Sequence, residues 1–126
     1  GGLMWFNSET RATTRGKGTA VELEAEKFLQ KKGLRKVTRN YLIKGGEIDL
    51  IMRDGEVLVF IEVRYRQSEE HGSGAETVTY QKQRRLRRAA LHYLQKHYGN
   101  REPDCRFDVI SASGNPVIFE WISDAF

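Results

Sequence analysis

Residues 47–66 read EIDLIMRDGEVLVFIEVRYR, and this stretch decides the fold. Asp54-Gly55 is a strong signal for a tight turn, so we expect strands over residues 47–52 and 57–66 to pair as a hairpin. The segment Val57-Leu58-Val59-Phe60-Ile61 is apolar without interruption, which is typical of a strand covered on both faces. The stretch therefore predicts a sheet with helices packed on it.

Two carboxylates interrupt this apolar hairpin, Asp49 in its first strand and Glu62 in its second. Side chains alternate between faces along a strand, so Asp49 should share a face with Glu47, opposite Ile48 and Leu50. Pairing across the turn can bring Asp49 beside Glu62. Ionised carboxylates in a covered strand are costly unless they are paired or bound to a metal, and Mg²⁺ prefers hard oxygen ligands. The pair is therefore a candidate metal site.

The same acids can instead be structural, forming ion pairs with arginines rather than binding a metal. On the second strand Glu62, Arg64 and Arg66 share a face, so Glu62 with Arg64, or Asp49 with Arg66, can form cross-strand ion pairs near a sheet edge. Short acidic spacings are common, and the spacing alone does not separate the two interpretations.

The rest of the chain predicts two helices and three further strands. A capping box from Thr19 to Glu22 starts a helix over residues 19–32, with a stripe of Val21, Ala25, Phe28 and Leu29, and Gly33 ends it. A strand follows over residues 37–43. A second helix covers residues 77–98, with Leu86, Ala90, Tyr93, Leu94 and His97 facing inward, and strands over 105–111 and 116–122 close the chain. The expected fold is α/β, a mixed sheet in α-β-β-β-α-β-β order flanked by helices.

Length and composition limit the class of protein. The chain has 126 residues, enough for one domain, which we place at residues 19–126 behind a flexible tail of residues 1–18. Cys105 is the only cysteine, so an internal disulfide is impossible and the reducing cytoplasm is the expected compartment. We interpret Cys105 as a small buried hydrophobic residue. No apolar run approaches the roughly 20 residues that a membrane span needs.

The net charge of +4 is unevenly distributed along the chain. Residues 47–76 hold eight acids against three bases, whereas residues 1–46 hold ten bases against four acids and residues 80–106 hold eight against two. A metal-dependent phosphodiesterase needs such an acidic centre with basic flanks, because carboxylates hold the cation while Lys and Arg hold phosphates. A solvated surface of salt bridges gives the same distribution.

The second helix carries five bases in the seven residues 82–88. Arg84, Arg87 and Arg88 are spaced i, i+3, i+4, where like charges repel one another unless an anion lies against them. We interpret this segment as a phosphate-binding face for nucleic acid, with a plain solvated face as the alternative.

Several motifs together resemble the YraN family of uncharacterised bacterial proteins. They are residues 46–51 (GEIDLI), residues 60–64 (FIEVR) with Arg66, Lys82, residues 106–109 (RFDV) and the terminal Ala125-Phe126, with Gly18, Glu22, Ala25, Leu29 and Gly33 agreeing in the first helix. The resemblance covers about residues 18–126. It implies a restriction-endonuclease-like core, related to archaeal Holliday-junction resolvases, whose αβββαβ order matches the order predicted above.

In such nucleases a D…ExK set binds Mg²⁺, and a glutamate from a helix often joins it. Carried over by resemblance, Asp49 and Glu62 become the metal ligands, with the Val63 carbonyl as a third, and Glu22 becomes the helix acid. The capping box alone also explains Glu22. Glu47 is either an acid supporting the ligands or a charge at the start of a strand.

One residue departs from the family pattern of such nucleases, because Arg64 stands where the lysine of ExK is expected. Arginine cannot act as a general base at ordinary pH, but its planar guanidinium can hold a phosphate. Water activation then falls to the metal, and Lys82 on the second helix can supply the missing ammonium.

The leading hypothesis is divalent-metal-dependent hydrolysis of nucleic-acid phosphodiesters, with Mg²⁺ or Mn²⁺ as cofactor and branched or damaged DNA as a candidate substrate. Asp49 and Glu62 bind the metal in this hypothesis, while Arg64, Arg66 and Lys82 contact the scissile phosphate. Two alternatives remain: a nucleic-acid-binding module that no longer cleaves, and an assembly protein whose basic helix binds an acidic partner. A dimer is compatible with each.

Overall fold

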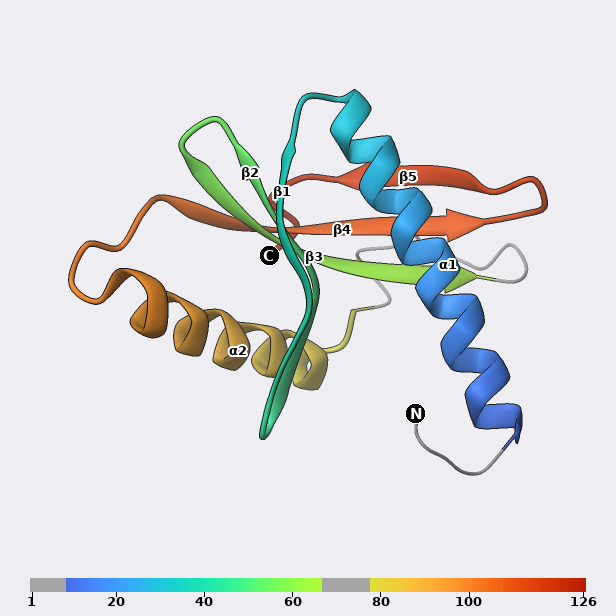
Figure 1. The fold of residues 1–126 in the computed structure, drawn as a ribbon, viewed down its shortest axis with the longest axis horizontal. Helices are drawn as coiled ribbons and strands as arrows, with labels where there is room; N and C mark the ends of the chain where they lie inside the picture. The colour runs from blue at the N-terminus through green and yellow to red at the C-terminus, as the bar shows by residue number, and fades with distance from the viewer. Residues whose placement is uncertain (1–8, 67–77) are drawn as a thin grey trace.

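The computed structural model describes residues 9–66 and 78–126, with side chains described from residue 20 onward. The predicted order of elements is confirmed (Figure 1). The elements are α1 (Glu9–Lys31), β1 (Arg35–Ile43), β2 (Gly46–Asp54), β3 (Val57–Arg66), α2 (Tyr80–Tyr98), β4 (Cys105–Ser113) and β5 (Ile118–Ile122).

The five strands form one mixed sheet in the order β1-β2-β3-β4-β5. Neighbouring strands are antiparallel except for β3 and β4, which run parallel, from Leu58 beside Cys105 to Arg66 beside Ser113. Parallel neighbours need a long crossover connection, and α2 lies in this one. The predicted α/β fold with a mixed sheet is therefore confirmed, and it is consistent with a restriction-endonuclease-like core.

Apolar side chains cover both faces of the sheet. On β3, Leu58 and Phe60 pack in one cluster while Val59 and Ile61 pack in another. The first, the α2 core, consists of Ile48, Ile51, Leu58, Phe60, Val78, Leu86, Ala89, Ala90, Tyr93, Leu94 and Val109. The second, the α1 core, consists of Ala25, Leu29, Leu34, Leu50, Met52, Val59, Ile61 and Ile110. The uninterrupted apolar run of β3 is thus explained by burial on both sides.

The β1–β2 hairpin bends where it leaves the rest of the sheet. Ile48 packs in the α2 core and Leu50 in the α1 core, although alternation predicts one face for both. Opposite the residue between them stands Asn40, whose φ of 56° is left-handed and interrupts the regular pleat. Beyond this point β2 pairs with β1 alone, and the hairpin crosses the start of α2 (Figure 1).

The first helix begins ten residues earlier than predicted. α1 starts at Glu9, so Thr19 lies inside it and the predicted capping box is wrong. Residues 9–18 lack an apolar period, but they contain no proline, and a helix anchored by Val21, Ala25 and Leu29 extends through them. Residues 1–8 lie outside the described residues. The flexibility of residues 1–18 stays a prediction.

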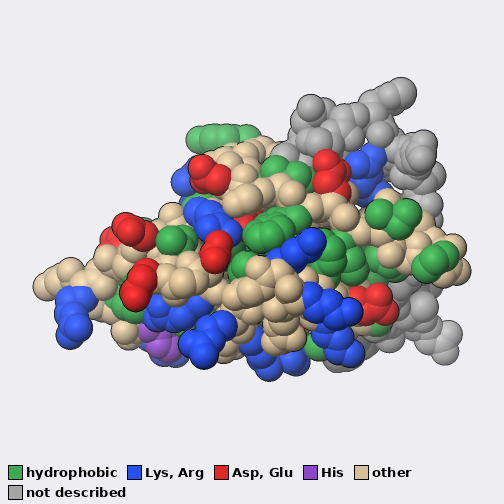
Figure 2. Space-filling view, turned by 90° about the horizontal axis from the view of Figure 1, so that it is seen from above, with side chains coloured by type: hydrophobic (Ala, Val, Ile, Leu, Met, Phe, Trp, Pro, Cys, Tyr) green, Lys and Arg blue, Asp and Glu red, His purple; other side chains and the backbone are tan. Residues whose placement is uncertain are grey.

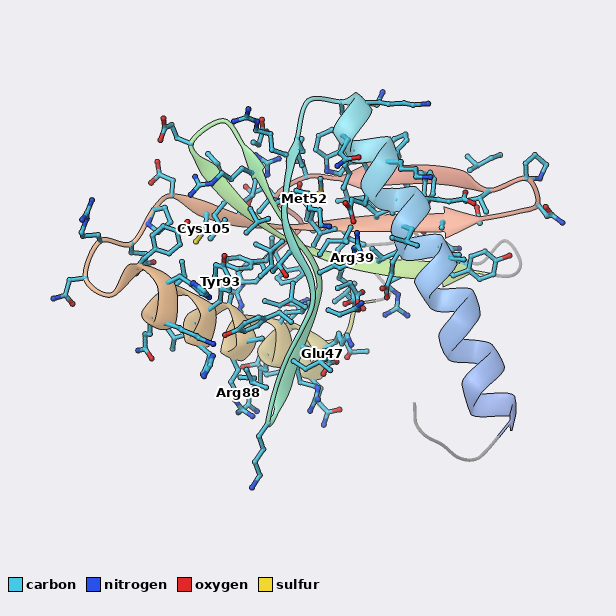
Figure 3. The ribbon with its side chains drawn as sticks, viewed as in Figure 1. Arg39, Glu47, Met52, Arg88, Tyr93 and Cys105 are labelled. Carbon is cyan, nitrogen blue, oxygen red and sulfur yellow. The ribbon has the colours of Figure 1, made fainter. Side chains whose placement is uncertain are left out.

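Two side chains predicted to be buried are exposed. Cys105 is the first residue of β4 and is exposed at the beginning of that strand (Figure 3). His97 lies in the last turn of α2 and is also exposed, whereas Leu86, Ala90, Tyr93 and Leu94 are buried as predicted. The prediction for His97 came from the helical period and that for Cys105 from its residue type, and both residues lie at an end of their element.

Charge on the surface is unevenly spread as well. In the face that Figure 2 displays, Lys and Arg side chains gather along the lower edge, while acids are scattered among other residues. Neither of the described helices has the length and apolar character that a membrane crossing requires.

Candidate functional site

Asp49 and Glu62 stand where β2 and β3 separate. The two strands pair from Asp54 opposite Val57 to Leu50 opposite Ile61, and the two acids come immediately after that last pair. The backbone N–H of Val63 donates to Oδ2 of Asp49 at 2.9 Å. The acids therefore lie side by side at a fork in the sheet, at the end of the doubly covered part of β3.

Burial makes this pair of carboxylates electrostatically unfavourable. Glu62 is only 5% exposed, and burial together with the charge of Asp49 raises its pKa from 4.5 to about 8. Burial also raises the pKa of Asp49 above its usual value. Oε1 of Glu62 is buried and receives no hydrogen bond from the described residues. The site thus holds excess negative charge that a proton or a cation would neutralise.

Glu22 of α1 is the third acid at the fork. Burial, then the charge of Asp49, raises its pKa from 4.5 to about 7, and the charge of Arg39 opposes this shift. Because Glu22 lies inside α1 rather than at its start, capping no longer explains it. Its position beside Asp49 agrees with the expectation for the helix acid.

Lys82 of α2 reaches the same site from the other side of the sheet. Its Nζ lies 2.6 Å from Oε2 of Glu47 and 3.8 Å from Oε2 of Glu62. Burial lowers the pKa of Lys82, but the hydrogen bond to Glu47 and the surrounding carboxylates outweigh it, so the pKa is raised. The ammonium is therefore a fixed positive charge beside the buried carboxylates.

Glu47 connects Lys82 to a second cation. Nη2 of Arg85 donates to Oε1 of Glu47 at 2.6 Å. Hydrogen bonds from Arg85 and then Lys82 lower the pKa of Glu47 from 4.5 to about 2, against the opposing effect of burial. Glu47 is thus more than a charge at the start of a strand, because it fixes two basic side chains of α2.

Arg64 and Arg66 follow Glu62 on β3. Nη1 of Arg64 is 4.0 Å from Oε2 of Glu62, and the Arg64 side chain is a third exposed. Its Nε is buried and has no hydrogen-bond partner among the described residues. Arg66 ends β3 and is half-buried. The ion pair proposed between Glu62 and Arg64, both on β3, is therefore at the outer limit of contact. Asp49 accepts a hydrogen bond from the backbone N–H of Val63.

The predicted cluster of Arg84, Arg87 and Arg88 is divided by the structure. Arg84 and Arg88 lie on one side of α2, around a hollow discussed below. The guanidinium of Arg87 instead stacks over the rings of Phe107 and Phe126, at 5.2 and 5.5 Å from their centroids. One helical step of about 100° separates Arg88 from Arg87, which places Arg87 over the aromatic C-terminus.

Not every buried acid belongs to the site. Asp108 is fully buried, yet it accepts from Arg106, from Nε1 of Trp121 at 2.9 Å and from the backbone N–H of Asp124 at 2.9 Å. Its hydrogen bonds tie the C-terminal segment to β4. A satisfied carboxylate of this kind is structural, and the contrast identifies Glu62 as the exception.

The described side chains do not form a complete set of metal ligands. Across the described side chains, those of residues 20–66 and 78–126, no three or more His, Cys, Asp and Glu residues are arranged to hold a metal ion together. Nδ1 of His92 shares a hydrogen bond of 2.6 Å with the hydroxyl of Tyr41. Asp49 and Glu62 therefore offer two carboxylates, and further oxygen ligands must come from Glu22, the Val63 carbonyl or water.

Comparison with known proteins assigns the family. Residues 21–112 match the model of the uncharacterised protein family UPF0102. The chain belongs to this family. It is 48% identical to the UPF0102 protein YraN of Escherichia fergusonii over 120 residues, which cover 94% of this chain and 90% of that protein. It is 47% identical to a UPF0102 protein of Xanthomonas euvesicatoria over 115 residues, covering 91% and 94%. The resemblance to the YraN family is confirmed.

The structure of this UPF0102 protein also places two arginines near the site that the sequence analysis did not single out, Arg39 and Arg85. Arg39 of β1 lies between the sheet and α1 (Figure 3), where its Nε donates at 3.0 Å to the buried Glu26. Its charge also acts on Glu22. Arg85 belongs to the basic run of α2, but only its contact with Glu47 distinguishes it from its neighbours. The spacing of these residues in the sequence does not predict the contacts, because each contact joins two different elements of the fold.

Proposed function

We propose that this UPF0102 protein binds nucleic acid and hydrolyses its phosphodiester bonds with a divalent cation, Mg²⁺ or Mn²⁺. The observation that carries the proposal is the buried carboxylate pair of Asp49 and Glu62, with Oε1 of Glu62 lacking a hydrogen-bond donor among the described residues. Native structures rarely leave a buried carboxylate oxygen without a partner, and an absent ion is one of the accepted explanations.

The donor chemistry fits a hard dication. Asp49 and Glu62 would hold it, with the Val63 carbonyl and Glu22 as further oxygen ligands, and all of these are the ligand type that Mg²⁺ prefers. The cation would offset the repulsion that raises the pKa of Glu62. When bound, it supplies Lewis-acid stabilisation of the phosphate and lowers the pKa of a bound water.

The basic residues around the pair have complementary roles. Arg64 is partly exposed beside Glu62, and its planar guanidinium suits a phosphate oxygen, although it cannot accept a proton. Lys82 brings a second positive charge to within 3.8 Å of Glu62. Arg66 would extend this positive line along β3. These side chains orient the phosphate and stabilise charge that develops on it.

The substrate class follows from charge and from family resemblance. The basic face of α2 suits a polyanion, and salt-sensitive binding is expected because phosphate contacts release counterions. Branched or damaged DNA is the candidate substrate implied by the resemblance to resolvases, and the site chemistry applies equally to RNA.

A nuclease panel tests the proposal. Wild-type protein and Glu62→Gln are compared on junction, flap, single-stranded and duplex substrates in Mn²⁺, with Glu120→Gln as the matched exposed control on β5. We expect cleavage by wild type and by Glu120→Gln, and a loss of about 100-fold or more in Glu62→Gln, since removal of a catalytic group typically costs 10² to 10⁴. Cleavage that persists in Glu62→Gln would show that Glu62 is not a catalytic residue. Cleavage that persists in EDTA would show that the reaction does not use the divalent cation bound by Glu62.

A second candidate function is nucleic-acid binding without cleavage. Two observations favour it: arginine stands at position 64, and the ammonium of Lys82 is held at 2.6 Å by Glu47. Binding that weakens with salt, that EDTA leaves unchanged and that leads to no cleavage of any substrate would establish this function. Absence of binding to any nucleic acid at low salt would leave an acidic protein partner as the third candidate.

A further inference from the structure

A hollow lies on the exposed side of α2 near its start. It has a volume of about 310 Å³, and its lining side chains are Gln81, Arg84, Arg85 and Arg88, which we call the arginine hollow. The lining side chains that the structure describes come from one surface of the helix, at spacings of three and four residues. Figure 3 labels Arg88 on α2 and Glu47 on the β1–β2 hairpin where it crosses that helix.

The charges in the arginine hollow are only partly balanced. Arg85 is bound to Glu47 at 2.6 Å, so its charge is matched. Arg88 donates weakly to the carbonyl of Gly45 at 3.4 Å, and Arg84 lies 6.0 Å from the ring centroid of Tyr80. Among the described residues neither Arg84 nor Arg88 pairs with a carboxylate. Two guanidinium charges of one hollow therefore remain without an anion, on positions where they repel each other.

We propose that the arginine hollow binds the terminal phosphate of a nucleic-acid strand. A phosphate inside a strand carries one negative charge, whereas a terminal phosphate monoester carries about −1.5 to −2 near neutral pH and offers three acceptor oxygens. The two unmatched guanidinium groups fit that greater charge, and the Gln81 amide adds a neutral donor. Guanidinium groups also match the geometry of phosphate oxygens.

One acid, Glu47, links the arginine hollow to the carboxylate pair. Glu47 binds Arg85 on the side of the hollow and Lys82 on the side of Glu62. A strand end held by Arg84 and Arg88 therefore presents its neighbouring linkages toward Lys82 and Glu62. This inference rests on the proposed function and narrows its substrate to strands with a phosphorylated end.

Binding without turnover tests the inference independently of cleavage. Single-stranded DNA labelled at an internal base is prepared with a 5′-phosphate, with a 3′-phosphate or with neither, and anisotropy is measured in EDTA. We expect one phosphorylated end to bind wild type about tenfold or more tightly than the unphosphorylated strand, as for a charge-assisted hydrogen bond gained. The preference for a phosphorylated end should disappear in the double variant Arg84→Gln and Arg88→Gln. It should persist in Lys96→Gln, which replaces an exposed base near the end of the same helix.

The outcomes separate the two proposals. Equal affinity for all three strands, or a preference that survives the double substitution, overturns the terminal-phosphate assignment. Cleavage of circular single-stranded DNA, which has no end, is measured in parallel in Mn²⁺. Persistent cleavage without end preference refutes this inference alone, whereas end preference without cleavage of linear or circular DNA refutes the nuclease proposal alone.

Discussion

The carboxylate of Glu47 holds the ammonium of Lys82 at 2.6 Å, and the same carboxylate binds Arg85. The contact joins β2 to α2 across 35 residues of sequence. It fixes the only lysine of α2 that reaches the carboxylate pair among the described residues. The stability of the region therefore depends on an acid that neither binds the proposed cation nor belongs to the apolar core.

Glu47→Gln should lower the free energy of unfolding by about 1–2 kcal/mol, because partly buried hydrogen bonds between charged groups are worth more than exposed ones. Urea unfolding measures the change. Glu56→Gln, at an exposed acid next to the Gly55 turn, serves as the control and should stay within about 0.5 kcal/mol of wild type. Equal stabilities for the two variants would show that the Glu47 contacts contribute nothing.

Mn²⁺ should raise the thermal stability of wild type, since a ligand that binds only the folded state stabilises it by mass action. At a concentration of 100 times Kd the gain is about 2.7 kcal/mol. Asp49→Asn and Glu62→Gln should each abolish most of this gain, as measured by thermal unfolding with and without the ion. A shift that both variants retain would locate the ion elsewhere.

In the absence of metal, the raised pKa of Glu62 predicts a specific pH dependence. The folded state keeps the proton up to about pH 8, whereas the unfolded state loses it near 4.5, so the contribution of Glu62 is complete below 4.5 and is lost as the pH rises through 8. Wild type should therefore lose stability relative to Glu62→Gln between pH 5 and pH 8. Parallel curves for the two proteins over this range would contradict the buried environment of Glu62.

Asn40 should be replaceable by glycine but not by alanine. Its φ of 56° is readily adopted by Gly, whereas the left-handed conformation costs a residue with a Cβ about 1–2 kcal/mol. Asn40→Ala should lower the unfolding free energy by about 1 kcal/mol, and Asn40→Gly should change it little. Chemical denaturation gives both values, and equal losses would argue against a conformational cause.

Gly46 is required by close packing rather than by its backbone conformation. A Cβ at this position would lie 2.5 Å from the carbonyl oxygen of Arg85 and 3.1 Å from the N of Ala89, both backbone atoms of α2. Gly46→Ala should therefore displace the hairpin from the helix and cost about 2 kcal/mol or more. Gly55→Ala, where an added Cβ meets nothing and only the positive φ is strained, should cost about 1 kcal/mol.

Much of the fold could be predicted because its signals are local. The Asp54-Gly55 turn, the apolar run of β3 and the helical period of α2 each lie within one element, and all three appear as predicted. The errors have a common source. The start of α1 and the exposure of Cys105 and His97 depend on where neighbouring layers begin and end, which no single segment encodes.

The candidate site divides in the same way. Asp49, Glu62 and Arg64 follow from the hairpin and from the family resemblance, and Lys82 follows from the resemblance and from the need to replace the lysine of ExK. The roles of Glu47 and Arg39, and the separation of Arg87 from Arg84 and Arg88, do not. Each of these depends on contacts between different helices and strands.

The sequence by itself determined that an apolar strand would carry a carboxylate into a covered sheet, because alternation and turn chemistry act between near neighbours. Only the tertiary structure decided how that charge is surrounded. The left-handed Asn40 lies opposite Asp49, where β2 separates from β3. Packing of α1 and α2 on opposite faces brings Glu22 beside Asp49 and Lys82 beside Glu62. Burial and the Coulomb interactions that it strengthens arise from this assembly, so the perturbed pKa values belong to the folded protein rather than to the chain.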